Sequence, residues 1–145
     1  TVLDAADIAR LSAVGGRLMI SPNVDTAVLN AALAAGMVTM PGVFTPTEAL
    51  MALKAGASGL KFFPANVLGP DGIKAISAVL PQGTIIGAVG GVDENGFAAY
   101  ARVGVRTFGL GSSLYKVGAT ASFVSERAKA TVKAYDLVFA PDSAS

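Results

Sequence analysis

One helix and one strand are encoded by the stretch TPTEALMALKAGASGLKFFP, residues 45–64. The helix begins with a capping box, in which Thr45 precedes Glu48 by three positions and a proline follows the cap. Gly56 is the residue type that ends helices, because it adopts the left-handed conformation without steric cost. The run at residues 59–63 is nearly all apolar, which is typical of a parallel strand covered on both faces. This stretch therefore predicts one unit of an α/β fold.

The same alternation recurs along the chain. Nearly all-apolar runs lie at residues 17–21, 37–40, 59–63, 84–89 and 107–110. Alanine-rich segments with helical spacing separate these runs, and we expect each to bury one face. The expected buried residues are Ala27, Leu29, Leu33 and Ala34 in one segment and Ala49, Leu50, Leu53 and Ala57 in the next. A last helix is expected over about residues 122–135, with a frayed tail at residues 141–145.

No linker or change of composition divides the chain, so residues 1–145 are expected to belong to one domain. Two architectures fit a series of strand–helix units: a doubly wound open sheet and a (β/α)₈ TIM barrel. A barrel needs eight strands, and the sequence shows five. No strand precedes the first expected helix, so we expect that the sequence starts late within a longer protein.

The composition excludes several kinds of chemistry. The 145 residues carry 11 Lys+Arg and 10 Asp+Glu, a net charge of +1, and contain no His and no Cys. The near-neutral charge gives no reason to expect nucleic acid or a membrane surface as a partner. Without His or Cys, these residues supply no His-based triad, thiol nucleophile or typical zinc site. No secretory signal or uninterrupted apolar span is visible, so a cytoplasmic location is expected.

Lys61 is the only lysine within an expected strand. Strand side chains alternate, so Lys61 and Phe63 should point to one face, and Leu60 and Phe62 to the other. Among apolar side chains an ammonium loses hydration, which lowers its pKa and favours an amine that can form a Schiff base with a carbonyl. The alternative is a strand-end lysine that extends into solvent. Spacing alone does not decide between the two.

Two glycine-containing turns follow the last two strands. Gly90-Gly91 and Gly111-Ser112 offer backbone amides and a hydroxyl that an anion can approach closely. In phosphate-binding barrels this site is formed by the loops after strands seven and eight. If the last two expected strands correspond to barrel strands seven and eight, the sequence lacks the first three strands of the barrel. Ordinary turn chemistry is the alternative, but the presence of the pattern in both loops favours phosphate.

No carboxylate is expected at a strand end beside Lys61. The acidic residues fall at helix starts, in loops, or in the last helix and the tail. Carbon–carbon bond chemistry needs a positioned base, so either a water molecule serves or the base lies outside these residues. Arg17 and Arg106 begin strands, at the end opposite the expected site, where a structural role is expected.

Six short segments carry a family resemblance. They are GLKFFPA at residues 59–65, VGGV at 89–92 and GLGS at 109–112, together with TVL at 1–3, SPN at 21–23 and MPG at 40–42. In this order they resemble the 2-keto-3-deoxy-6-phosphogluconate and 2-keto-3-deoxy-6-phosphogalactonate aldolases, and the resemblance covers essentially the whole chain. It implies a trimeric class I aldolase, a lyase of carbohydrate metabolism, on a (β/α)₈ barrel that needs neither cofactor nor metal.

Carried over by position, the resemblance implies that Lys61 forms the Schiff base. At position 89 the gluconate branch usually has Thr. This chain has Val89, as the galactonate branch does, which favours the phosphogalactonate substrate. The implied substrate-binding positions are Thr1 and Pro22 beside the pyruvate moiety, Phe63 packed on it, Val89, and, around the phosphate, Gly90, Gly91, Gly111 and Ser112.

The implied reaction cleaves 2-keto-3-deoxy-6-phosphogalactonate to pyruvate and glyceraldehyde 3-phosphate, with phosphogluconate aldolase activity as the alternative. The family's first three strands carry its general-base Glu and a carboxylate-binding Arg, and this sequence contains neither. Residues 1–145 are therefore expected to form the last five strands of the barrel and their helices. Two other interpretations are open: a phosphate-sugar barrel enzyme without covalent chemistry, and a catalytically incomplete half-barrel that binds phosphate.

Overall fold

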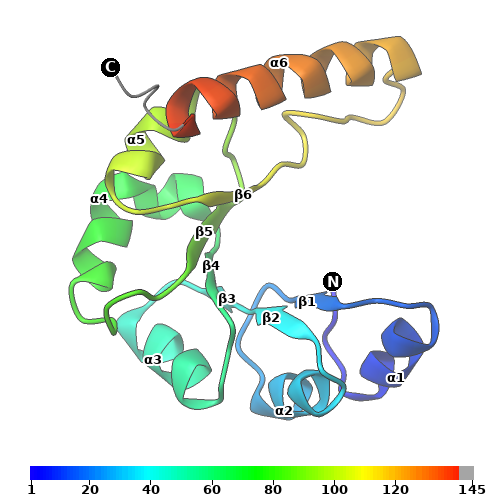
Figure 1. The fold of residues 1–145 in the computed structure, drawn as a ribbon, viewed down its shortest axis with the longest axis vertical. Helices are drawn as coiled ribbons and strands as arrows, with labels where there is room; N and C mark the ends of the chain where they lie inside the picture. Colours follow the sequence, from blue (N-terminus) through cyan, green and yellow to red (C-terminus); the bar gives the residue numbers. More distant parts are fainter. Residues whose placement is uncertain (141–145) are drawn as a thin grey trace.

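The computed structural model describes residues 1–140, and the expected frayed tail at residues 141–145 lies outside the described residues. Helices and strands alternate along the chain, as the sequence predicts (Figure 1). The helices are α1 (Ala6–Ala13), α2 (Thr26–Ala34), α3 (Pro46–Lys54), α4 (Ala65–Ser77), the one-turn 3₁₀ helix η1 (Glu94–Gly96), α5 (Phe97–Arg102) and α6 (Ala121–Phe139). The strands are β1 (Leu18–Ile20), β2 (Val38–Met40), β3 (Gly42–Val43), β4 (Leu60–Phe62), β5 (Ile86–Val89) and β6 (Thr107–Gly109).

The paired strands are all parallel. β1 pairs with β2, and β3, β4, β5 and β6 follow one another in a second sheet. β2 and β3 are separated only by Pro41, a residue that lacks an N–H for the ladder. The carbonyl of Pro41 still accepts a hydrogen bond from the N–H of Lys61 at 3.0 Å, and that of Thr39 accepts one from Gly59 at 3.1 Å. The five predicted strands are therefore confirmed as successive parallel neighbours.

The strands follow a curved path, and the helices lie outside it. In Figure 1, α2, α3, α4 and α5 line the convex side of the arc that runs from β1 to β6, and α6 crosses its far end. A doubly wound sheet carries helices on both faces, so that alternative is wrong. A parallel sheet covered by helices on one side matches the wall of a (β/α)₈ barrel, and the partial barrel itself stays a prediction.

The main core lies between the strands and the helices on the convex side. Leu60 and Phe62 of β4 are fully buried there. Phe97 of α5 stacks against Phe108 of β6, with ring centroids 4.4 Å apart. Burying a side chain of this size contributes roughly 1.5–3 kcal/mol. This side of the sheet therefore supplies most of the apolar stabilisation.

The concave side of the sheet is less covered. Leu18 and Ile20 of β1 are 48% and 40% exposed, and Val38 of β2 is 52% exposed. Leu18 and Ile20 line the same cavity as Lys61, which places them on its face of the sheet. Large apolar side chains gathered on one face indicate a surface that something else covers.

The predicted buried faces of two helices are partly wrong. In α2 the buried residues are Val28, Leu29 and Ala32, whereas Leu33 is 36% exposed. In α3 they are Ala49 and Ala52, while Leu50 and Met51 are exposed. Both helices carry apolar residues on every side, so spacing alone does not select a face.

The last helix extends beyond its predicted end. α6 continues to Phe139, because the ring of Phe139 packs on that of Tyr135 with centroids 4.4 Å apart and also contacts Phe108. Tertiary packing therefore holds a turn that local sequence does not predict. Among the helices of residues 1–140, none has the length and apolarity needed to cross a membrane.

Candidate active site

Lys61 lies in β4, within the four-stranded sheet. The side chains of Leu60 and Phe62 enter the main core, while Lys61 lies with Phe63, as strand alternation predicts. Its Nζ is 4.8 Å from the centre of the Phe63 ring. Lys61 is only 7% exposed, so it is not a strand-end lysine that extends into solvent.

Burial lowers the pKa of Lys61 below its ordinary value of 10.5. The cause is the hydration that the ammonium loses among apolar neighbours. Within residues 1–140 the ion pairs are Arg10–Asp7 and Arg127–Glu94, so no carboxylate pairs with Lys61 to offset this loss. The neutral amine is therefore more populated near neutral pH than on a surface lysine, and the neutral amine is the form that attacks a carbonyl.

Glycines flank Lys61 on both neighbouring strands. Gly42 of β3 and Gly87 of β5 are its register partners. At Gly87 the Thr107 hydroxyl and the end of the Met40 side chain lie where a Cβ would be, so glycine lets them approach beside the lysine. At Gly42 a Cβ would overlap the backbone of Pro22. Glycine thus lets the loop after β1 pack closely on β3, which brings Pro22 to the site.

Three cavities adjoin one another on this face and at the carboxyl ends of the strands. The first, of about 230 Å³, is lined by Lys61 and Val89 among others. The second, of about 380 Å³, contains Val89, Phe63 and both glycine turns. The third, of about 300 Å³, contains Phe63 and Pro22. Val89 lines the first two cavities and Phe63 the second and third, so the structure places near one another the predicted residues Pro22, Lys61, Phe63, Val89, Gly90, Gly91, Gly111 and Ser112.

The two glycine turns form the polar wall of the second cavity. Gly90 and Gly91 have φ angles of 95° and 66°, which favour glycine. The N–H of Asn66 donates to the carbonyl of Gly90 at 3.0 Å and ties this turn to the start of α4. At Gly111 an added Cβ would meet no atom of residues 1–140 within 4 Å. Exposed backbone amides and the Ser112 hydroxyl are groups that bind a small oxyanion.

Thr1 lies near the same end of the sheet but outside these cavities. The N–H of Val2 donates to the carbonyl of Ile20, the last residue of β1, at 3.3 Å. Thr1 itself is exposed and is not among the residues that line the three cavities. Met40, which is part of the MPG segment, and Thr107, which belongs to no motif, by contrast line the Lys61 cavity. Only the strand register could have indicated Thr107 as a lining residue.

A carboxylate does reach the third cavity, that of Glu48. Its Oε2 accepts hydrogen bonds from the N–H groups of Phe44 at 2.7 Å and Thr45 at 2.9 Å. The predicted capping box is thus confirmed, and this carboxylate serves to cap α3. In the described part of the chain, no group of three or more His, Cys, Asp or Glu residues could hold a metal ion.

Arg106 has the structural role that its position predicts. Its Nη1 donates to the carbonyl oxygens of Ala101 at 2.9 Å and Val105 at 3.1 Å, and the guanidinium lies 5.3 Å from the centre of the Phe139 ring. These contacts hold α5 and α6 at the amino end of β6.

Comparison with known proteins agrees with the resemblance. The family model described as KDPG and KHG aldolase matches residues 1–130. The chain belongs to this aldolase family. A probable 2-dehydro-3-deoxy-6-phosphogalactonate aldolase from Rhizobium meliloti (strain 1021) is 66% identical over 139 residues, 96% of this chain. The 2-dehydro-3-deoxy-6-phosphogalactonate aldolase of Escherichia coli (strain K12) is 42% identical over 135 residues, 93% of this chain. The chain spans 66% of the length of each of these aldolases.

A solved aldolase structure shows the same fold. The structure described as "Native KDPGal structure" matches with a TM-score of 0.92 and 40% sequence identity over 95% of this chain and 67% of that chain. The predicted α/β class is confirmed, since the matched structure has the barrel-type fold of these aldolases and the strands described here are parallel.

Proposed function

We propose that this chain is the lysine-bearing part of a class I aldolase that cleaves 2-dehydro-3-deoxy-6-phosphogalactonate to pyruvate and glyceraldehyde 3-phosphate. The observation that carries the proposal is Lys61, a buried lysine of lowered pKa whose cavity shares Val89 with the cavity of the glycine turns. The substrate follows from the names of the aldolases from Rhizobium meliloti and Escherichia coli.

The chemistry requires an amine, and Lys61 supplies it. The Lys61 amine attacks the C2 ketone, and loss of water gives an iminium. The iminium takes up the electron pair of the C3–C4 bond as the C4 hydroxyl loses its proton, and glyceraldehyde 3-phosphate leaves. An enamine remains on Lys61. Protonation at C3 and attack by water then release pyruvate and restore the amine.

The other predicted residues bind and orient the substrate in this proposal. Phe63 packs on the pyruvate moiety and Pro22 borders it, whereas the border role that the resemblance implies for Thr1 has no support from the cavities, since Thr1 lines none of the three. The backbone amides of the two glycine turns and the Ser112 hydroxyl hold the phosphate in the second cavity. The proton of the C4 hydroxyl passes to a water molecule or to a base outside these residues, because Glu48 is committed to its helix cap.

Borohydride reduction in the presence of pyruvate tests the proposal. Borohydride reduces an iminium to a stable amine, so mass spectrometry of peptides should find a pyruvate adduct at Lys61. The Lys61→Arg variant keeps a positive charge but should form no adduct and have no activity. Lys54→Arg, on the exposed end of α3, is the matched control and should react like the unsubstituted protein.

Two outcomes would contradict the aldolase proposal. One is the absence of any pyruvate adduct, and the other is an adduct only at lysines other than Lys61. Protection of the protein by phosphate without an adduct would instead favour a phosphate-sugar enzyme that uses no covalent chemistry.

We also propose that residues 1–145 provide the last five strands and helices of a (β/α)₈ barrel. The helices on one side of the sheet and the exposed Leu18, Ile20 and Val38 on the other support it. The chain contains no Cys, so a single Leu18→Cys substitution gives one thiol to probe. That thiol should react with a maleimide in these 145 residues alone and be protected in a longer protein that completes the barrel.

A homotrimer is the assembly that the family resemblance implies. Exposed apolar side chains on α3, Leu50 and Met51, offer surface that subunit contacts could cover. Light scattering coupled to size-exclusion chromatography should give three times the mass of one chain. The cytoplasmic location stays a prediction, which cell fractionation would check.

A further inference from the structure

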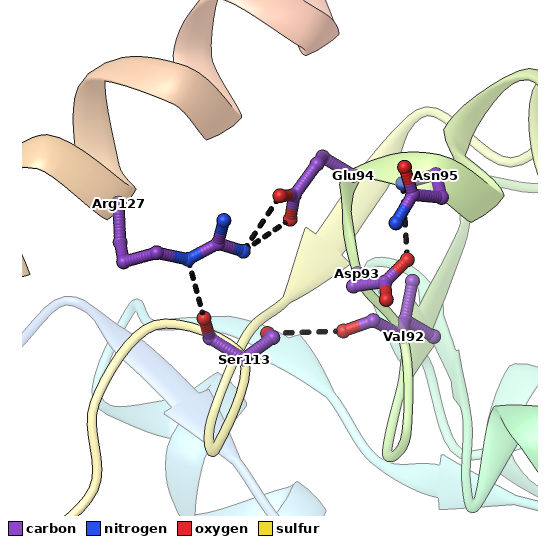
Figure 2. A network of polar contacts seen from close by, with 6 residues as sticks. All are labelled: Val92, Asp93, Glu94, Asn95, Ser113 and Arg127. Atoms are coloured by element: carbon purple, nitrogen blue, oxygen red, sulfur yellow. Dashed lines mark hydrogen bonds and ion pairs between the residues drawn. The ribbon is translucent and has the colours of Figure 1, made fainter.

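A polar network joins the two glycine turns to α6 (Figure 2). Nη2 of Arg127 lies 2.6 and 2.8 Å from the two carboxylate oxygens of Glu94, and Nε of Arg127 donates to the carbonyl of Ser113 at 3.2 Å. The hydroxyl of Ser113 donates to the carbonyl of Val92 at 3.1 Å. Val92 directly follows Gly91, and Ser113 directly follows Ser112.

The hydrogen bonds of the sheet do not extend into these two turns. The β5–β6 register ends at Val89 and Gly109. Within the described residues, no backbone hydrogen bond joins residues 90–93 to residues 110–113. Glycine-containing turns have large conformational freedom in the unfolded chain. The side-chain network is therefore what crosslinks the two halves of the proposed phosphate site.

The charge of Arg127 is already neutralised. Its side chain is 31% exposed and that of Glu94 is 16% exposed, so the pair is partly shielded from solvent. Both carboxylate oxygens face the same guanidinium nitrogen, and a second guanidinium nitrogen is used by the Ser113 carbonyl. Arg127 is thus arranged to hold backbone in place and not to act as a free cation for an anion.

We propose that Arg127 is a positioning residue, which with Glu94 and Ser113 sets the spacing of the Gly90-Gly91 and Gly111-Ser112 turns so that both bind one phosphate. The inference rests on the proposed function, because the two turns that the network positions are the phosphate site of that function. It predicts an effect on the phosphate end of the substrate and none on pyruvate chemistry at Lys61.

Two measurements on the same variants test this role: calorimetric titration with inorganic phosphate, and the rate of borohydride trapping with pyruvate. Arg127→Met and Glu94→Gln should each raise the Kd for phosphate about tenfold, which corresponds to about 1.4 kcal/mol. The rate of pyruvate trapping should stay within about twofold, since the network touches no part of the Lys61 cavity. Lys129→Met, an exposed cation on the same helix, is the matched control and should change neither quantity.

Two milder variants keep the test valid if Arg127→Met fails to fold. Arg127→Lys keeps a charge beside Glu94 but cannot bridge both partners, so it should give an intermediate Kd. Ser113→Ala removes only the hydrogen bond to Val92 and should raise the Kd for phosphate about threefold, or about 0.7 kcal/mol.

The outcomes separate this inference from the aldolase proposal. If Glu94→Gln tightens phosphate binding, Arg127 is itself a ligand and the positioning role is wrong. If the Arg127 variants lower the Tm but leave the Kd for phosphate unchanged, the network is structural only, which also overturns the inference. Failure of the unsubstituted protein to bind phosphate would also overturn the positioning inference. Failure of the unsubstituted protein to trap pyruvate would contradict the aldolase proposal instead.

Discussion

On β4, adjacent residues face opposite environments. Leu60 and Phe62 are fully buried against the helices of the convex side. Lys61 lies on the concave side, where it meets the Phe63 ring, two glycine register partners and a cavity of about 230 Å³. The convex face is closely packed, whereas the concave face keeps a cavity next to the Lys61 ammonium, a group that is costly to bury.

The difference between the faces separates stability from chemistry. Substitutions on the convex side should act on the free energy of unfolding, because they remove apolar contacts that nothing replaces. Substitutions on the concave side should act on reactivity, and removal of its charge should even stabilise the fold. The following predictions test this division, from the largest expected effect to the smallest.

Phe62→Ala should lower the free energy of unfolding by about 3–5 kcal/mol, because it leaves a cavity in the main core. Urea unfolding followed by circular dichroism measures the loss. Phe63→Ala, one residue further along on the concave side, is the matched control and should cost much less, since Phe63 is only partly buried. If Phe62→Ala and Phe63→Ala lower the free energy of unfolding equally, the convex and concave faces do not differ in their contribution to stability.

Lys61→Met should raise the free energy of unfolding at pH 7 by about 1–3 kcal/mol, the scale of a buried polar group without compensation. Burial lowers the pKa of Lys61 in the folded state below 10.5, so between these two pKa values the unfolded chain binds more protons. Stability of the unsubstituted protein therefore rises with pH across that window. The pH-dependent part of the methionine advantage should be complete below the lowered pKa and decrease as the pH rises through the window up to 10.5.

Urea unfolding at pH 7 and pH 10 checks the sign of this effect. Lys54→Met, an exposed control on α3, should show no such dependence on pH. A Lys61→Met variant that is less stable than the unsubstituted protein at pH 7 would mean that the lysine is favourably accommodated.

The two glycine turns should respond differently to alanine. Gly91→Ala should cost about 1–2 kcal/mol of stability, because a side chain at a φ of 66° is strained and would overlap Asn66. Gly111→Ala meets no neighbouring atom of the described residues within 4 Å, so its Tm should change little while its Kd for inorganic phosphate rises severalfold. Thermal unfolding and calorimetry distinguish the two, and unchanged phosphate binding in Gly111→Ala would argue against a phosphate in the second cavity.

Val89→Thr should have the smallest effect. Val89 lines both the Lys61 cavity and the second cavity, where an added hydroxyl could donate to the C4 oxygen of the phosphogluconate epimer. We expect the ratio of kcat/KM for the two epimers to move toward phosphogluconate by about threefold, or about 0.7 kcal/mol. A ratio that is the same before and after the substitution would exclude Val89 as the residue that selects the epimer.

Much of the fold is readable from local sequence. The five apolar runs are strands, the capping box at Thr45 and Glu48 starts α3, and Gly56 ends it in the left-handed conformation. The buried faces of α2 and α3 are not readable, because their apolar residues surround the helix and only contacts with other elements choose among them. Arg127 also escapes prediction, since nothing in the sequence around it indicates a partner 33 positions away.

The sequence by itself determined the order of strands and helices and placed one lysine, with alternating apolar neighbours, inside a strand. Periodicity and capping depend on residues close together in the chain, so they can be read without the fold. Only the tertiary structure decided that Lys61 is desolvated, that its cavity lies next to those of the glycine turns and of Pro22, and that Arg127 ties those turns together. These properties depend on strand register and on packing between distant segments, which set the hydration and the neighbours of each side chain.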